Sequence, residues 1–235
     1  MSKAAAGFSQ RSLYMEQMIE KGMDLCFVFD LNPYKDNDEL RSCFIYRVNM
    51  LMVYLSTFGP GYFVSIYMLD GPYEEAFTKR AVADIEYLPA LKQRYFKSLT
   101  PTKDCSPHHS YALYEKTEKA IREAQNKTPS VSYDTHCFYV TGTPVTRCHN
   151  EEHGFDALHE DSFHHLYLLG MDEDEASQTC EDTGCEGFFL YDLNDEGMDD
   201  CFADIFHTLK AVRFNFESGT EPIDDDAERF GWYLS

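Results

Sequence analysis

An aspartate ends the first strongly apolar segment of the chain, a position at which α/β proteins commonly bind ligands. The apolar run 25–29 is followed by Asp30, Asn32 and Pro33. A carboxylate and an amide supply oxygen atoms that can bind a hard cation such as Mg²⁺. The alternative is structural: Asp30 accepts backbone hydrogen bonds and caps the next turn, which the Asn-Pro pair shapes. We favour the structural role, because these two groups alone would bind Mg²⁺ poorly.

Cysteine and histidine gather further along the chain, in a segment expected to be a loop. The candidate zinc ligands are Cys148, His149, His153 and His159, with His164 and His165 nearby. Cys-His-x-x-x-His spacing is feasible for tetrahedral ligation of Zn²⁺. No Cys-x-x-Cys pair accompanies it, and histidines in loops are more often simply solvated. Zinc is therefore the minor alternative, and we expect no metal and no other cofactor.

A cysteine nucleophile is the third chemistry that the residue types allow. Cys105 with His108, or Cys148 with His149, would supply a thiol beside a base. Neighbours in sequence do not make a catalytic pair without the right tertiary geometry, and no local signature of a cysteine enzyme is present. The segment after Phe29 also lacks the glycines that cradle a phosphate. We expect no enzymatic activity.

The charge is divided very unevenly along the chain. Residues 1–147 carry 17 basic and 17 acidic side chains, whereas residues 148–235 carry 3 and 24, which accounts for the whole net charge of −21. No Lys or Arg lies between Arg147 and Lys210. A negative field of this size repels phosphate and attracts basic surfaces. We therefore expect no direct binding of nucleic acid by this half.

The acidic half has two interpretations of about equal weight. One is a solvated surface that keeps the protein soluble; the other is a docking surface for a protein subunit with a basic surface. The carboxylates expected to contact such a partner are Asp172, Glu173, Asp174, Glu175, Asp195, Glu196, Asp199 and Asp200. Tyr95 and Phe96 are added as aromatic contacts, since aromatic side chains dominate binding hot spots. Phe63 and Tyr67, by contrast, are expected to fill the core.

Composition also bounds the setting of the protein. Eight cysteines are too sparse for a disulfide scaffold in 235 residues, and two of them lie inside apolar segments. We expect a reducing compartment, nuclear or cytoplasmic. No apolar run is long enough to span a membrane, and residues 1–22 lack the apolar core of a signal peptide.

Apolar periodicity predicts alternating strands and helices. The six strands of the sheet are expected over 24–30, 62–69, 77–85, 135–140, 164–169 and 187–191, with a further strand over 213–216 after them. Helices are expected over 9–21, 38–58, 89–97, 110–126, 172–180 and 199–209. The fold class is α/β, a doubly wound and mostly parallel six-stranded sheet with helices on both faces. Residues 1–22 would form a leading helix, 23–212 the domain and 213–235 an acidic extension.

This order of elements resembles a von Willebrand factor A domain. The resemblance rests on the strand that ends in Asp30, the loop and helix after Ser106, and the way the domain closes. The last elements of the domain are a strand ending at Gly170, an acidic helix, the aromatic strand 187–191 and a final helix. It covers roughly residues 23–210 and depends on the order of patterns rather than on a rigid motif.

The sequence departs from this family at its metal-ion-dependent adhesion site. The family has Asp-x-Ser-x-Ser after the first strand, a Thr in a later loop and an Asp after the fourth strand. Here Asp30 is kept, Asn32 and Tyr34 stand at the serine positions, and Ser106 can stand for the Thr. No carboxylate follows the fourth strand. The resemblance therefore implies a degenerate site of Asp30, Asn32 and Ser106 without a functional metal ion.

Metal-free domains of this kind occur in nuclear assemblies. Residues 30–33 resemble the small von Willebrand-type subunit of the transcription and repair factor TFIIH. Residues 54–59 and 141–145 resemble the amino-terminal domain of the Treslin family of replication-origin firing factors. The resemblance favours the Treslin type and implies a non-catalytic scaffold for protein–protein interaction in replication initiation. The alternatives are a TFIIH-like subunit and a divalent-metal-dependent ligand-binding domain.

Overall fold

The fold was examined in a computed structural model of the chain. It describes residues 21–30, 36–59, 61–68, 75–81, 119, 132–146 and 162–219. Several sequence predictions fall outside these ranges: the leading helix, the helices over 89–97 and 110–126, and residues 220–235. The same holds for Asn32, Tyr34, Tyr95, Phe96, Cys105, Ser106, His108 and the four candidate zinc ligands.

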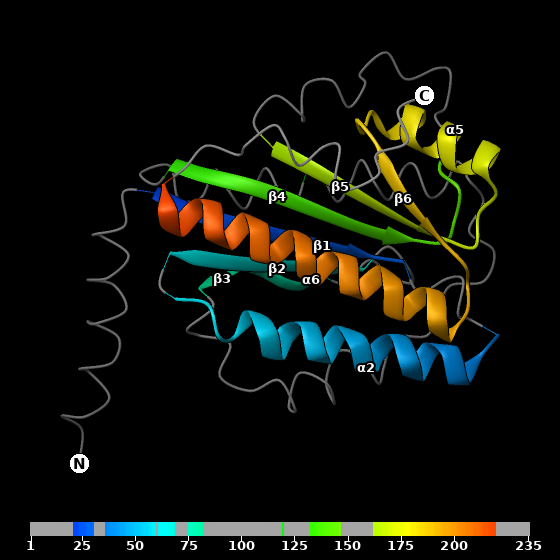
Figure 1. The fold of residues 1–235 in the computed structure, drawn as a ribbon, viewed down its shortest axis with the longest axis horizontal. Helices are drawn as coiled ribbons and strands as arrows, with labels where there is room; N and C mark the ends of the chain where they lie inside the picture. The colour runs from blue at the N-terminus through cyan, green and yellow to red at the C-terminus, as the bar shows by residue number, and fades with distance from the viewer. Residues whose placement is uncertain are drawn as a thin grey trace.

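Six strands form one sheet in the order β3-β2-β1-β4-β5-β6 (Figure 1). Their bounds are β1 Lys21–Phe29, β2 Tyr62–Met68, β3 Glu75–Ala81, β4 Ser132–Thr141, β5 Ser162–Leu169 and β6 Phe188–Tyr191. All neighbouring strands are parallel except β2 and β3, which are antiparallel. The predicted α/β class and mostly parallel six-stranded sheet are therefore confirmed. Because β1, β2, β4, β5 and β6 run the same way, their carboxyl ends share one edge of the sheet, called here the carboxyl edge.

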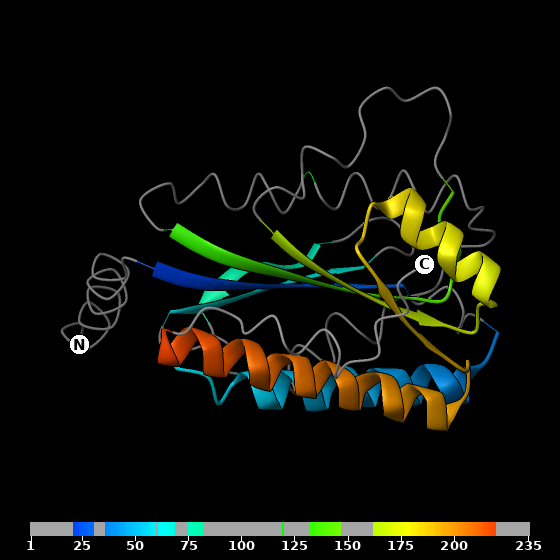
Figure 2. The ribbon, with the colours of Figure 1, turned by 45° about the horizontal axis from the view of Figure 1, so that its top comes forward.

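Helices cover both faces of the sheet. Helix α2 (Asp38–Leu55) and helix α6 (Asp195–Ser218) lie side by side on one face, and α5 (Glu173–Thr183) lies on the other (Figure 2). The central strand β1 is apolar from Leu25 to Phe29 because both of its faces are buried there. Phe27 and Phe29 belong to the core under α2 and α6, whereas Cys26 and Val28 belong to the core under α5.

The core under α2 and α6 is built largely from aromatic rings that contact one another across neighbouring strands. Phe138 stacks on Phe27 with ring centroids 4.9 Å apart, and Phe44 of α2 meets Phe29 edge-on at 5.6 Å. Phe63 and Tyr67 are 7% and 0% exposed, so their predicted place in the core is confirmed.

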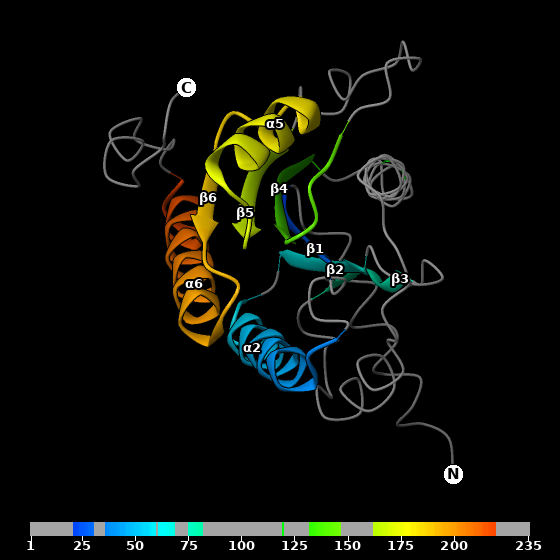
Figure 3. The same cartoon turned by 90° about the vertical axis from the view of Figure 1, so that its right-hand side faces the viewer.

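Each described helix begins at the carboxyl edge with a side-chain cap. Asn37 accepts from the Leu40 N–H at 3.0 Å to start α2, and Asn194 accepts from the Gly197 N–H at 2.7 Å to start α6. Asp172 starts α5 in the same way. Figure 3 looks onto this edge, where the helices follow the strand ends.

The last helix is longer than the sequence prediction at both ends. Residues 213–216, expected as a strand because aromatic residues alternate there, lie inside α6, which ends only at Gly219. Tertiary contacts decide the conformation: Phe216 packs edge-on against Tyr62 at 5.0 Å, and the Arg213 guanidinium lies 4.7 Å from the centre of the Phe58 ring. The predicted strand over 213–216 is therefore wrong, and α6 runs through the predicted boundary at residue 212.

Candidate functional site

Asp30 lies at the carboxyl edge directly after β1, as the sequence indicates, and is only 3% exposed. Its N–H donates to the Val140 carbonyl at 2.9 Å, which ties it to the end of β4. The Thr141 hydroxyl donates to its Oδ2 at 2.8 Å. Thr141 in turn accepts from the Thr143 N–H at 3.1 Å. The Asp30 carboxylate thus has a structural partner that sequence reasoning missed.

The family pattern requires a carboxylate after the fourth strand and therefore does not point to Thr141. The signal was nevertheless present, since parallel neighbours β1 and β4 must end at the same edge of the sheet. The remaining residues of the degenerate metal site, Asn32 and Ser106, lie outside the described residues. Across the part of the chain that is described, no three His, Cys, Asp or Glu side chains are arranged to hold a metal ion.

The predicted docking carboxylates do come to one edge of the molecule. Four belong to the start of α5 and four to the first turns of α6, and all eight are exposed. The start of α2 adds Asp38 and Glu39 at the same edge. The topology gathers them because each of these helices follows a parallel strand. We call the eight predicted carboxylates the acidic edge.

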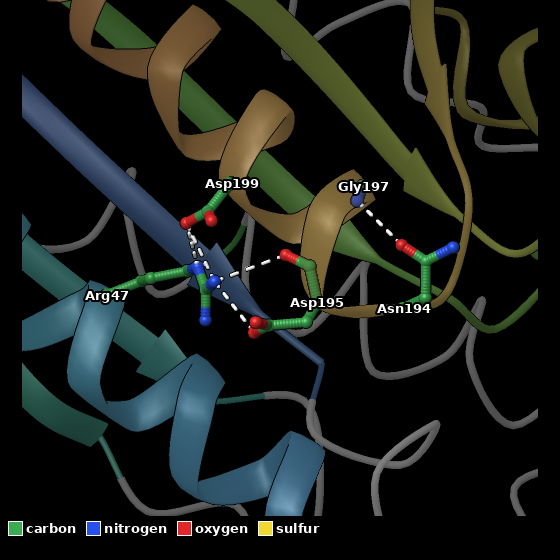
Figure 4. A network of polar contacts seen from close by, with 5 residues as sticks. All are labelled: Arg47, Asn194, Asp195, Gly197 and Asp199. Atoms are coloured by element: carbon green, nitrogen blue, oxygen red, sulfur yellow. Dashed lines mark hydrogen bonds and ion pairs between the residues drawn. The ribbon is translucent and has the colours of Figure 1, made fainter.

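Two members of the acidic edge are engaged by a cation within the chain (Figure 4). Arg47 of α2, only 9% exposed, donates from Nε to Asp199 Oδ1 at 2.8 Å and from Nη2 to Asp195 Oδ1 at 2.8 Å. A third hydrogen bond joins Nη2 to the Asp195 carbonyl at 3.1 Å. Asp195 and Asp199 remain 65% and 68% exposed. They fasten α6 to α2 and still present oxygen atoms to solvent.

The electrostatics of this network follow from its geometry. Burial alone would lower the pKa of Arg47, but its hydrogen bonds to Asp199 and then to Asp195 outweigh burial and raise it. The hydrogen bond from Arg47 lowers the pKa of Asp195. The sequence offered one sign of this partner, since Arg47 lies next to the apolar stripe of α2 that faces the core.

At the start of α5, the acidic residues have two roles. The Glu175 N–H donates to Asp172 Oδ1 at 2.8 Å, and the Asp172 N–H donates to Glu175 Oε2 at 3.3 Å. This reciprocal capping box stabilises the helix start. Asp172 and Glu175 therefore belong to the structure as well as to the acidic edge, whereas Glu173 and Asp174 extend the same exposed turn.

A pocket of about 510 Å³ opens beside the start of α6. Asp192, Glu196 and Asp200 contribute carboxylates to its lining, and Met171 and Leu190 contribute apolar surface. Gly197 allows the helix to start here, because a Cβ at this position would lie 2.2 Å from the Asp192 carbonyl oxygen. Part of the acidic edge is thus hollowed rather than flat.

The two histidines named beside the zinc candidates are placed on β5. His165 Nε2 lies 3.0 Å from His136 Nδ1 of β4, and the two rings stack with a 5° interplanar angle. Burial lowers the pKa of His136 to about 4 and that of His165 to about 3. The pair is therefore neutral near pH 7. His136 was not anticipated, because the pairing depends on the register of β4 against β5.

In the described part of the chain, no helix is long and apolar enough to cross a membrane. No family model matches the sequence, and no curated protein matches it.

Solved structures do resemble the fold. Proximal thread matrix protein 1 from the mussel byssus, in a structure with a zinc-occupied MIDAS motif (the metal-ion-dependent adhesion site), covers 80% of this chain and 48% of its own, with 11% identity and a TM-score of 0.53. The PilB minor pilin from Streptococcus sanguinis covers 82% and 62%, with 10% identity and a TM-score of 0.55. The pilus adhesin SpaC from Lactobacillus rhamnosus GG covers 83% and 31%, with 8% identity and a TM-score of 0.53.

The chain thus spans less than two thirds of the length of each of these proteins. At this level of identity the likeness concerns the fold and not the activity. The strand order, the helices on both faces and these structural neighbours together show that the chain has a von Willebrand factor A-like fold.

Proposed function

We propose that this domain is a non-catalytic scaffold that docks a protein subunit with a basic surface through its acidic edge. One observation carries the proposal: eight exposed carboxylates from two separate helix starts converge on one edge of the sheet. Convergence of one charge steers and orients an oppositely charged partner. Within the acidic edge, Arg47 is the internal cation that the structure pairs with these carboxylates, and it engages only Asp195 and Asp199.

The positions of the exposed carboxylates fit a scaffold better than a domain that binds its ligand through a divalent cation. Asp30, the one carboxylate kept from the family's adhesion site, is buried and accepts a hydrogen bond from Thr141. The exposed carboxylates lie instead at the starts of α5 and α6. We therefore place partner binding at these helix starts rather than around Asp30.

The pathway is a finer part of the same proposal. The sequence resemblance of residues 54–59 and 141–145 to the Treslin family supports a nuclear assembly in replication initiation. Residues 30–33 support the alternative of a TFIIH-like subunit in transcription and repair. Both readings make the chain a non-enzymatic subunit in a reducing compartment, with no direct contact to nucleic acid.

Two other roles of the carboxylates, helix stabilisation and solubility, must be distinguished from docking by experiment. Acidic residues in a first helical turn stabilise the helix through its dipole, by roughly 0.3–1 kcal/mol each. The same residues can also serve only for solubility. A docking surface differs from both because neutralising it must remove a partner without unfolding the domain.

The test uses two double variants that avoid the structural carboxylates. Glu173→Gln with Asp174→Asn neutralises the exposed turn of α5, and Glu196→Gln with Asp200→Asn neutralises the start of α6. Each variant changes the charge by two and spares the capping box and the Arg47 network. The matched control is Glu181→Gln with Glu186→Gln, which makes the same charge change near the other end of α5.

Wild type and variants are immobilised on resin and incubated with nuclear extract at 0.1 and 0.3 M salt. The retained proteins are quantified by mass spectrometry. We expect basic partners that bind wild type and the control, and that are reduced at least about tenfold by either double variant. Binding should also weaken at the higher salt. Equal retention by all four proteins would assign the carboxylates to helix stability and solubility, and would overturn the docking proposal.

A further inference from the structure

Two half-buried cysteines, Cys180 and Cys185, meet where α5 ends. The helix stops at Gly184, whose φ of 68° is left-handed. The Cys185 N–H donates to the Cys180 carbonyl at 3.2 Å, and the Gly184 N–H donates to the Glu181 carbonyl at 3.1 Å. This pair of bonds is the Schellman ending of a helix, in which the side chains at the positions of Cys180 and Cys185 characteristically contact each other.

The sulfur of Cys180 points toward Cys185. Its Sγ lies 3.1 Å from the Cys185 carbonyl oxygen, to which the thiol donates. Both side chains pack against the core under α5, so they turn to the same side of the chain. Neither cysteine is part of a disulfide in this structure.

This arrangement meets the backbone requirement for a disulfide. Bridged cysteines have Cα atoms roughly 4.4–6.8 Å apart and Cβ atoms that face each other. A backbone hydrogen bond between the same two residues holds their Cα atoms in about this range. The other described cysteines differ, since Cys26, Cys137 and Cys201 are buried and Cys43 of α2 lies beside Arg47 and Asp195.

We propose that Cys180 and Cys185 are a reversible redox site that closes an intrachain disulfide at the end of α5. The oxidant is a low-molecular-weight disulfide such as oxidised glutathione. One thiol attacks it, which forms a mixed disulfide and releases one reduced glutathione. The second thiol then attacks the protein sulfur, which releases the second glutathione. In total, two thiols and one glutathione disulfide give one protein disulfide and two glutathione thiols.

Burial raises the pKa of Cys180 to about 11, so its thiolate is scarce at neutral pH. Since the thiolate is the attacking form, exchange at this site should be faster at pH 9 than at pH 7.

The bridge would fasten the turn at Gly184 to the last turn of α5. A short closed loop constrains the unfolded chain, and the expected rise in Tm on oxidation is about 5 °C. The inference does not depend on the docking function, because the cysteines lie at the opposite end of α5 from Asp172.

The experiment treats the folded full chain with oxidised glutathione, blocks the remaining thiols with iodoacetamide and maps the linkages by mass spectrometry. The Tm is measured before and after treatment. Cys180→Ser and Cys185→Ser remove the site, and Cys43→Ser is the matched control on α2. The mapping on wild type decides the question even where a variant fails to fold.

A peptide linking Cys180 to Cys185 is expected in wild type and in Cys43→Ser, together with the rise in Tm. The link should disappear on addition of excess reduced glutathione. Recovery of Cys180 and Cys185 as separate glutathione adducts or alkylated thiols, or linked to other cysteines, would overturn the proposal.

Discussion

Arg47 of α2 and Asp199 of α6 are joined by a hydrogen bond of 2.8 Å, although 152 positions separate them in the sequence. With Asp195, they fasten the start of the last helix to the first helix of the same face. The acidic edge thus also holds the domain together. Its contacts with Arg47 must therefore be distinguished from its contacts with another protein.

The two sides of this network should respond differently to mutation. Arg47→Met should cost only about 1 kcal/mol, because Asp195 and Asp199 are exposed enough to be solvated without it. Asp195→Asn combined with Asp199→Asn should cost more than Arg47→Met, because it leaves a largely buried guanidinium poorly compensated. Urea unfolding measures both values. Arg41→Met, which removes a more exposed pair with Asp38, is the control with an expected cost below about 0.5 kcal/mol. A larger cost for Arg47→Met than for the double variant would contradict this account.

Thr141→Val should destabilise the domain by about 1–3 kcal/mol, since it removes the hydrogen bond to the buried Asp30 carboxylate. Thr141→Ser keeps the hydroxyl and should cost clearly less. The measurement is again the free energy of unfolding in urea. If Thr141→Val, which keeps a methyl group, costs no more than Thr141→Ser, which removes it, the hydrogen bond to Asp30 is not the main contribution at this position.

Added Mg²⁺ should leave the Tm unchanged to within about 1 °C at millimolar concentration. A ligand that binds the folded state raises the Tm, and Asp30 is already engaged by Thr141. Differential scanning fluorimetry with and without EDTA measures the effect. A rise of several degrees that Asp30→Asn abolishes would support the divalent-metal-dependent alternative instead.

Acid should destabilise the domain through the His136–His165 pair. Their folded pKa values, about 4 and about 3, lie below the ordinary value of 6.5, so the unfolded chain binds more protons between these limits. The contribution is complete above pH 6.5 and is lost progressively as the pH falls through 4 to 3. Urea unfolding between pH 7 and pH 4 measures this loss.

The variant with both His136→Phe and His165→Phe should lose much of this pH dependence, because neither ring can then take up a proton. The His136 ring stacks on Phe163 and the His165 ring stacks on Phe138, so a phenylalanine ring can replace each histidine in these stacks. His207→Gln, at an exposed position of α6, is the control and should retain the wild-type slope. An unchanged slope in the double phenylalanine variant would assign the acid sensitivity to other groups.

The sequence predicts the sheet well because its strongest signals are local. Residues 25–29 are apolar on both faces, which indicates a central strand, and Asp30 marks its carboxyl end. The starts of α5 and α6 could be predicted to within four residues or fewer from capping residues and acidic first turns. The end of α6 could not, because Phe216 is held in the helix by Tyr62, which is distant in sequence.

Within the site, charge could be predicted and pairing could not. The excess of carboxylates is visible in the sequence, and the parallel topology explains why they converge. The engagement of Asp199 by Arg47 depends on how α2 packs beside α6. The pairing of His136 with His165 depends on a strand register that composition does not specify. Both are tertiary facts that a one-dimensional pattern does not contain.

The central claim is that charge at the acidic edge binds a partner. The most direct measurement compares two quadruple variants by quantitative capture from nuclear extract. One neutralises the edge with Glu173→Gln, Asp174→Asn, Glu196→Gln and Asp200→Asn. The other keeps every charge but exchanges side-chain length, with Glu173→Asp, Asp174→Glu, Glu196→Asp and Asp200→Glu. Our account predicts that the neutral variant stays folded but loses the basic partners of wild type, whereas the charge-retaining variant keeps them. Full retention of those partners by the neutral variant would contradict it.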